Sequence, residues 1–281
     1  MNSIIKTNNF DSNAVTFSMN VDKTTKRKMF FVNHDKKAVL IKTPKMYFPN
    51  GLKHWKSDAY ADSFELEASF GDDPKDPQNE LEIKDFHEKM KALDEMIKNE
   101  ILKNPKDWIG KSKTSMEMIE ESYYPNPIVR VPRDSDGNIL EYNEKIKIKL
   151  DRERVGDTYT GYFSSNNRER TRVMVFDQEN NNLDITEENC ESVIPKGTTG
   201  NLLIQFVNIN IVGDKVYPKW KLIQAKISRN RGMRIDTNVF EDDVADTVEE
   251  FKDLDVLDDK DVLDDAPELA KPKKSKKPHV H

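Results

Sequence analysis

The chain has 281 residues, of which 36% are hydrophobic and 34% charged, and its formal net charge at pH 7 is −6. This composition predicts a thin core under a strongly solvated surface. The one cysteine, Cys190, excludes an intramolecular disulfide and is expected to be an inert thiol. The first ten residues lack the apolar core of a signal peptide, and no stretch approaches the roughly 18 apolar residues of a membrane span. We therefore expect a soluble, intracellular protein.

Residues 14–70 are typical of strands and turns. Residues 14–19, 29–32 and 38–41 are short runs rich in β-branched and aromatic residues. Residues 64–70 alternate apolar and polar, which predicts a strand whose inner face carries Phe64, Leu66, Ala68 and Phe70.

Residues 79–122 are predicted to be helical. The spacing of the apolar residues between 79 and 103 repeats every three or four positions, which gives one stripe along a helix. Asn104-Pro105 is expected to end that helix. A second, shorter helix is predicted over residues 112–122, with Met116 and Ile119 facing inward.

Residues 128–228 return to a strand pattern. Residues 145–150 alternate strictly, with a lysine on every outward position. Residues 158–163 and 171–176 follow, and residues 202–212 and 216–228 flank Gly213-Asp-Lys215, which is a good hairpin signal. About five strands at this close spacing favour a small closed or half-closed barrel over a parallel sheet.

Residues 241–281 differ sharply in charge from the rest. Residues 241–268 hold fourteen acidic residues against two lysines, whereas residues 270–281 hold five lysines, so residues 1–240 carry a net charge of +1. We expect a disordered tail that competes with an anionic partner for the same surface. Residues 272–278 also fit a nuclear import signal, or simply a solubilising run. Four apolar tail residues are candidates for recruiting a partner: Phe251, Leu254, Leu257 and Leu263.

The motifs of several enzyme classes are absent from the sequence. It contains no Gly-rich phosphate loop, no CxxC and no HExxH, and its five histidines are scattered. Asp134-Ser-Asp-Gly-Asn138 is typical of a turn, because it lacks the later glutamate of a calcium loop. We therefore predict no catalysis, no cofactor and no metal.

Three segments place positive charge beside aromatic residues. Residues 23–56 carry ten basic residues against one acid, three arginines alternate over residues 168–172, and residues 214–234 carry seven basic residues against one acid. Single-stranded nucleic acid requires this combination, because cations neutralise its phosphates and flat rings stack on its exposed bases. A protein that recognises double-stranded DNA would instead need a basic recognition helix.

Pro125-Asn-Pro-Ile-Val-Arg130, which follows a helical segment and opens a β-rich region, resembles the Pro-Asn-Pro-Ile-x-Arg element of single-stranded DNA-binding proteins from large nucleocytoplasmic DNA viruses. An N-terminal segment, Thr43-Pro-Lys-Met-Tyr47, adds to the resemblance, which covers about residues 25–230. The family is similar in turn to T7-like phage single-stranded DNA-binding proteins with one OB-fold and an acidic C-terminal tail. The resemblance implies an OB-fold and nonspecific binding of single strands in viral DNA replication, recombination and repair. It places the protein in the host cytoplasm, in a viral factory, or in the nucleus.

We therefore predict a mainly β, α+β protein with an OB-fold-type barrel, added N-terminal strands and two helices. Residues 1–240 form the DNA-binding domain and residues 241–281 the tail, which would bind a polymerase, helicase or primase. The sequence does not decide between DNA and RNA, and it leaves open the site size, the cooperativity and the oligomeric state. It also leaves open which of the aromatic residues stack on bases and which belong to the core. The rivals are a protein–protein scaffold or virion component and a magnesium-dependent nuclease. The predicted stacking residues are Tyr47, Trp55, Tyr159, Tyr162 and Trp220. The predicted phosphate contacts are Lys36, Lys37, Lys45, Lys53, Arg168, Arg170, Arg172, Lys219, Lys221, Arg229 and Arg231.

Overall fold

The computed structural model describes residues 4–23, 25–56, 58, 61–71, 76–134, 136–166 and 169–228. The predicted tail lies outside the described residues, and so do Arg168, Arg229 and Arg231. In the described part the chain is mainly β with a few helices, which confirms the predicted class at that level.

The N-terminal region consists of strands and short turns, as predicted. On β8 the period-two pattern holds, because Phe64, Leu66 and Ala68 are each at most 1% exposed. Two 3₁₀ turns, η1 (Thr7–Asn9) and η2 (Ser12–Ala14), separate the first strands. The strands are β1 (Ile5–Lys6), β2 (Val15–Val21), β3 (Lys28–His34), β4 (Lys37–Ala38), β5 (Leu40–Lys42), β6 (Met46–Phe48), β7 (Leu52–Trp55) and β8 (Ser63–Ser69).

The main helix, α1 (Pro77–Lys103), confirms the apolar stripe predicted over residues 79–103. Asp76 caps its start by accepting a hydrogen bond from the Asn79 backbone N–H at 3.1 Å. Asn104-Pro105 ends α1 as expected, but Pro105 also begins a short helix, α2 (Pro105–Ile109). This helix was not predicted, although proline suits the first turn of a helix. The next helix is α3 (Met116–Met118), continued by a π-helical turn, η3 (Ile119–Tyr123).

The C-terminal half is again made of strands. The Gly213-Asp214 turn joins β15 to β16, as the sequence predicted. A four-residue helix, α4 (Cys190–Val193), contains the buried Cys190. The strands are β9 (Val129–Arg130), β10 (Lys145–Val155), β11 (Thr158–Asn166), β12 (Thr171–Arg172), β13 (Met174–Phe176), β14 (Asn182–Leu183), β15 (Thr198–Val212) and β16 (Lys215–Ser228).

Five strands pair in a closed circuit, in the order β15, β6, β8, β10, β16 and back to β15. The neighbours are antiparallel except for β10 and β16, which are parallel and joined through Lys149 and Lys221. The apolar sides of these strands contribute to one continuous core. Their polar sides therefore point away from it, and they carry the charges discussed below.

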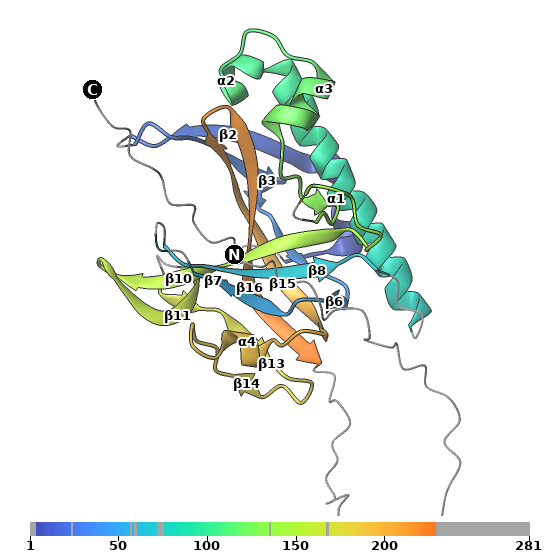
Figure 1. Cartoon of the computed structure of the whole chain (residues 1–281), viewed down its shortest axis with the longest axis vertical. Helices are drawn as coiled ribbons and strands as arrows, with labels where there is room; N and C mark the ends of the chain where they lie inside the picture. The colour runs from blue at the N-terminus through green and yellow to red at the C-terminus, as the bar shows by residue number, and fades with distance from the viewer. Residues whose placement is uncertain are drawn as a thin grey trace, which may run out of the picture. The chain divides into compact units, whose positions relative to one another are not determined.

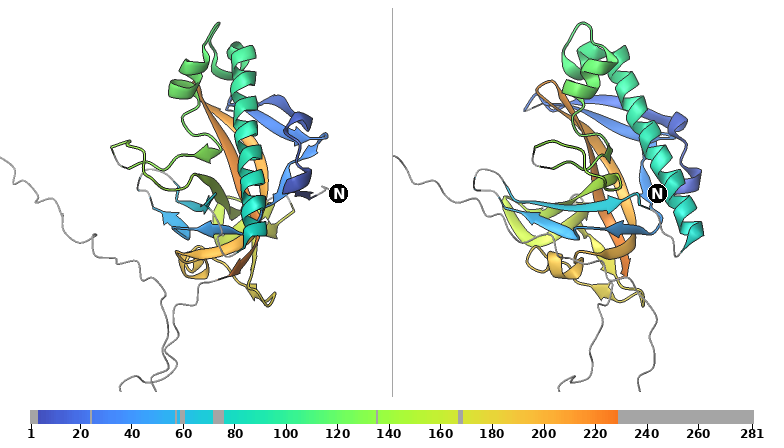
Figure 2. Two further views of the ribbon diagram at one scale, coloured as in Figure 1. Left: turned by 90° about the vertical axis from the view of Figure 1, so that its right-hand side faces the viewer. Right: turned by 45° about the vertical axis from the view of Figure 1, so that its right-hand side comes forward.

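The β15–β16 hairpin is long enough to reach beyond this circuit. Near its turn β15 pairs with β3, which pairs with β2 (Figure 1). Helix α1 runs along one side of the strands, while the β2–β3 turn and the far end of β10 project toward the other side (Figures 1 and 2). No helix among the described residues is long and apolar enough to cross a membrane.

Candidate nucleic-acid interface

A groove of about 590 Å³ lies between the β2–β3 turn, the outer side of β10 and the end of the β15–β16 hairpin. Six cationic residues line it against two acidic ones, and Tyr217 contributes an aromatic ring. Such a groove can hold a chain of phosphates beside a surface for stacking. The cations are Arg27, Lys28, Arg130, Lys147, Lys149 and Lys219, and the acids are Asp22 and Glu65.

Strand β10 supplies the floor of the groove because of its alternation. Ile146, Ile148 and Leu150 are buried, so Lys147 and Lys149 point outward from the opposite face of the strand. Lys149 lies directly opposite Lys221 of β16. The two strands therefore bring lysines from distant parts of the chain side by side.

The β2–β3 turn forms one wall of the groove. Asp22 organises the turn: its backbone N–H donates to Arg27 O at 2.9 Å, and its side chain accepts from Thr25 N at 2.6 Å. Lys28 donates to the backbone oxygen of Asp107 at 3.2 Å, which ties the wall to α2. The turn therefore holds Arg27 and Lys28 at the rim.

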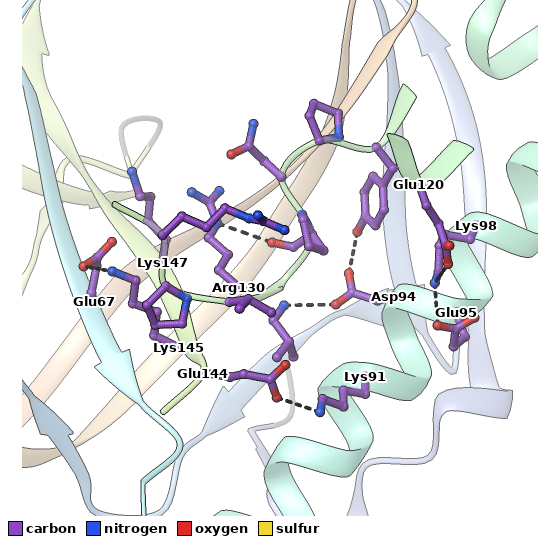
Figure 3. A pocket seen from close by; sticks show the side chains of 18 residues that line it. Glu67, Lys91, Asp94, Glu95, Lys98, Glu120, Arg130, Glu144, Lys145 and Lys147 are labelled. Atoms are coloured by element: carbon purple, nitrogen blue, oxygen red, sulfur yellow. Dashed lines mark hydrogen bonds and ion pairs between the residues drawn. The ribbon is translucent and has the colours of Figure 1, made fainter. Parts of the chain in front are cut away.

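Arg130 reaches the groove from the Pro125–Arg130 element, which a buried carboxylate on α1 fixes in place. Asp94 accepts hydrogen bonds from Tyr124 Oη at 2.6 Å, Ile128 N at 2.8 Å and Val129 N at 2.9 Å (Figure 3). Burial raises the pKa of Asp94 to about 6, although these donors and Lys98 oppose the shift. The element is thus structural, and it positions the arginine that ends it.

A second groove of about 550 Å³ lies between this element and α1 (Figure 3). It shares Asn126, Arg130 and Lys147 with the first groove, so the two are adjacent. Its charges are nearly balanced, because Glu67 accepts from Lys145 and Glu144 pairs with Lys91. Of the two grooves, the first is therefore the strongly cationic one, with Arg130 at their junction.

Two of the groove's lysines form ion pairs with carboxylates on the outer face of the sheet. Lys147 Nζ lies 2.5 Å from Glu65 Oε2, and Lys219 Nζ lies 2.7 Å from Asp151 Oδ1. Burial lowers the pKa of Arg130, with the negative charges of Glu65 and Glu67 among the effects that oppose it. Arg27, Lys28 and Arg130 have no carboxylate within ion-pair distance among the described residues.

Four predicted site residues lie in or beside the groove. Lys219 lines it. Lys221 neighbours Lys149 and donates to Ser165 O at 2.6 Å, and burial lowers the pKa of its ammonium group. On β7, Lys53 lies opposite Glu65 and places its Nζ 5.5 Å from the ring centre of Trp55, which is 53% exposed.

Trp220 does not fit its predicted role as a stacking residue. Its side chain is 2% exposed and its ring stacks on Phe206, with ring centres 4.6 Å apart. Trp220 points inward on β16 because it alternates with the outward-facing Lys219 and Lys221. We therefore assign it to the core.

Tyr159, Tyr162 and Arg172 form a separate cluster along the β10–β11–β12 ladder. Arg172 lies 3.6 Å from the ring centre of Tyr162 and also pairs with Glu153 at 3.1 Å. Arg152 covers the ring of Tyr159 at 3.7 Å. Arginines thus already cover one side of each ring, and Arg170 is exposed in the neighbouring turn.

Four other predicted contacts lie away from the groove. Lys36 and Lys37 follow the far end of β3, a strand of seven residues that spans about 20 Å from Lys28. The backbone of Lys45 bonds Asn79 in the first turn of α1, about 22 Å along the helix from Asp94. Tyr47 is 45% exposed and pairs with Thr199 and Ser69. None of these four residues lines the groove.

The predicted site omitted six residues that line the groove, although the sequence carried a signal for each: Arg27, Lys28, Arg130, Lys147, Lys149 and Tyr217. Arg27, Lys28 and Tyr217 stand in basic segments, the two lysines of β10 alternate along their strand, and Arg130 ends the Pro-Asn-Pro element. Among the described residues there is also no group of three or more His, Cys, Asp or Glu side chains arranged to hold a metal ion.

No protein-family model and no curated protein sequence matches the chain. Among solved structures, the single-stranded DNA-binding protein of bacteriophage Enc34 in complex with ssDNA is similar over 73% of this chain and 92% of its own, with a TM-score of 0.38 and 12% identity. A C-terminal truncation of that protein covers 79% and 99%, with a TM-score of 0.37 and 11% identity. Bacteriophage T7 gp2.5, also a single-stranded DNA-binding protein, covers 74% and 100%, with a TM-score of 0.35 and 12% identity.

The neighbours in these comparisons are thus phage single-stranded DNA-binding proteins, a class that the sequence resemblance named. The family of large nucleocytoplasmic DNA viruses is not shown by them and stays a prediction.

Proposed function

We propose that the chain binds and coats single-stranded DNA without sequence specificity, and that the groove floored by β10 holds the sugar–phosphate backbone. The observation that carries the proposal is the convergence of six cationic residues from four parts of the chain, beside Tyr217. Contacts to phosphates carry no sequence information, so binding through them is nonspecific.

The closed circuit of five strands supports an OB-type barrel as the scaffold of this groove. Tyr217, Trp55 and the Tyr159–Tyr162 cluster would stack on bases, because none of these side chains is buried. Trp55 and Tyr159 are exposed, and Tyr162 and Tyr217 are half-buried. We further propose a role in viral replication, recombination and repair, in the host cytoplasm or nucleus. The proposed tail, residues 241–281, would recruit a replication protein.

The test is the double variant K147A/K149A, measured by fluorescence anisotropy with a labelled oligothymidine. Two lost phosphate contacts should weaken binding about tenfold or more at 50 mM salt and reduce the slope of log K against log salt by about 1.4. The matched control is K84A/K103A, which removes two ion-paired lysines from α1 outside both grooves.

Equal losses in the two double variants would contradict the groove assignment. Preference for duplex over single strands would contradict the proposed ligand. The rival functions also make distinct predictions: a scaffold would self-associate in a salt-sensitive way, and a nuclease would require magnesium and show turnover.

A further inference from the structure

Glu65 occupies an unusual position for an acidic residue in a groove that binds phosphates. It lies on β8, opposite Lys53 on one side and Lys149 on the other, and it lines the cationic groove. Its side chain is only 10% exposed. A carboxylate is thus built into the floor where the phosphate backbone is expected to lie.

The carboxylate bridges two lysines of β10. Its Oε2 lies 2.5 Å from Lys147 Nζ, and its Oε1 lies 3.5 Å from Lys149 Nζ. A phosphate group, which also presents several oxygens, would take up the same kind of bridging position between two ammonium groups. In the free protein Glu65 therefore stands where a phosphate would otherwise bind.

From this arrangement we propose that Glu65 is a built-in anion that makes the groove select a polynucleotide over small phosphate-bearing molecules. The inference rests on the proposed function and adds a selectivity-determining residue to it. Glu65 would exclude inorganic phosphate, nucleotides and other small anions from Lys147 and Lys149.

The selectivity follows from the distribution of charge. A small anion beside Lys147 and Lys149 gains little, because Glu65 already pairs with both lysines, leaves them a net charge of only +1, and repels a second negative group. A polynucleotide is repelled there too, but it also contacts Arg27, Lys28 and Arg130, which lack a carboxylate partner among the described residues. Only an extended anion reaches enough of these groups at once.

The experiment compares wild type with E65Q, which removes the charge and keeps the shape. Calorimetry with inorganic pyrophosphate, without DNA, should show binding by E65Q and none by wild type. E65Q should also bind oligothymidine roughly tenfold more tightly at 50 mM salt, with a smaller difference at 300 mM because salt screens the repulsion. The control E117Q makes the same charge change on an exposed residue of α3 outside both grooves and should match wild type in both assays.

A second variant covers the case in which E65Q does not fold. Asp151 holds Lys219 of the same groove at 2.7 Å, and its side chain is 29% exposed, so D151N should be better tolerated. D151N should gain in the same direction by a smaller factor.

Absence of pyrophosphate binding by the folded variants would overturn the inference, even if wild type binds oligothymidine. Failure of wild type to bind oligothymidine would instead overturn the proposed function, while the pyrophosphate measurement would still report on Glu65.

Discussion

Asp94 shows how one buried side chain can shape a binding surface. Its two oxygens accept from the Tyr124 hydroxyl and from the backbone N–H groups of Ile128 and Val129, so they fix the backbone that leads to Arg130. The spacing of apolar residues over 79–103 predicted only an amphipathic helix. It did not predict which groups would donate hydrogen bonds to an aspartate on the inner side of that helix. Burial of this carboxylate raises its pKa to about 6.

The raised pKa predicts a specific pH dependence of stability. The ordinary pKa of Asp94 is 3.8, so between pH 4 and 6 the folded protein holds a proton that the unfolded chain has lost. The free energy of unfolding should therefore fall by about 3 kcal/mol from this group as pH rises through that range. Urea unfolding at several pH values should show a flatter profile for D94N, whose amide does not titrate.

The control for this measurement is D85N, on the same helix with a side chain that is 44% exposed. Because it leaves Asp94 intact, it should retain the wild-type profile. A D94N profile as steep as wild type would mean that Asp94 is not the titrating group.

The orientation of an individual residue could be predicted where the alternation of apolar and polar residues alone decides which face of a strand it occupies. The lysines of residues 145–150 face outward as expected, and the same rule turns Trp220 inward. The sequence predicts which residues are exposed, but it does not say which exposed lysines meet a second strand. Lys36 and Lys149 are both lysines on or next to strands, and only pairing with β8 and β16 places Lys149 in the groove.

The β2–β3 hairpin forms the wall that makes a groove beside the basic face of β10. The hairpin packs against α2, where the Trp108 ring stacks on Phe30 with ring centres 3.8 Å apart and contacts Phe17 edge to face. The strands of this hairpin were predicted from their composition. Its support was not, because α2 has five residues and begins at a proline that first signals the end of α1.

Trp108 should therefore contribute much to the stability of this wall. Its side chain is 2% exposed, so W108A should lower the free energy of unfolding by about 3–5 kcal/mol through the lost ring contacts and the cavity left behind. W55A removes the same side chain where it is 53% exposed and should cost less than about 0.5 kcal/mol. Urea unfolding followed by circular dichroism measures both, and similar losses would argue against the packing described here.

At the scale of the whole molecule, the groove is assembled from residues about 190 positions apart, from Arg27 on β2–β3 to Lys219 on β16. Local periodicity predicts each strand, but the closed circuit of pairings depends on contacts distant in sequence. That is why the class of fold could be predicted from the sequence and the site only in part. The net charge of residues 1–240 is +1, so the cationic groove reflects arrangement more than composition.

Residues 241–281 change the net charge of the chain from +1, for residues 1–240 alone, to −6. A tethered anion competes with DNA for a cationic groove at a high effective concentration. Deletion of residues 241–281 should therefore tighten binding to oligothymidine at 50 mM salt, and the gain should shrink at 300 mM as the charges are screened. Deletion of residues 270–281 alone removes five lysines and leaves the acids, so it should weaken binding. Anisotropy titrations of both truncations test the competition, and unchanged affinity at low salt in the longer deletion would exclude it.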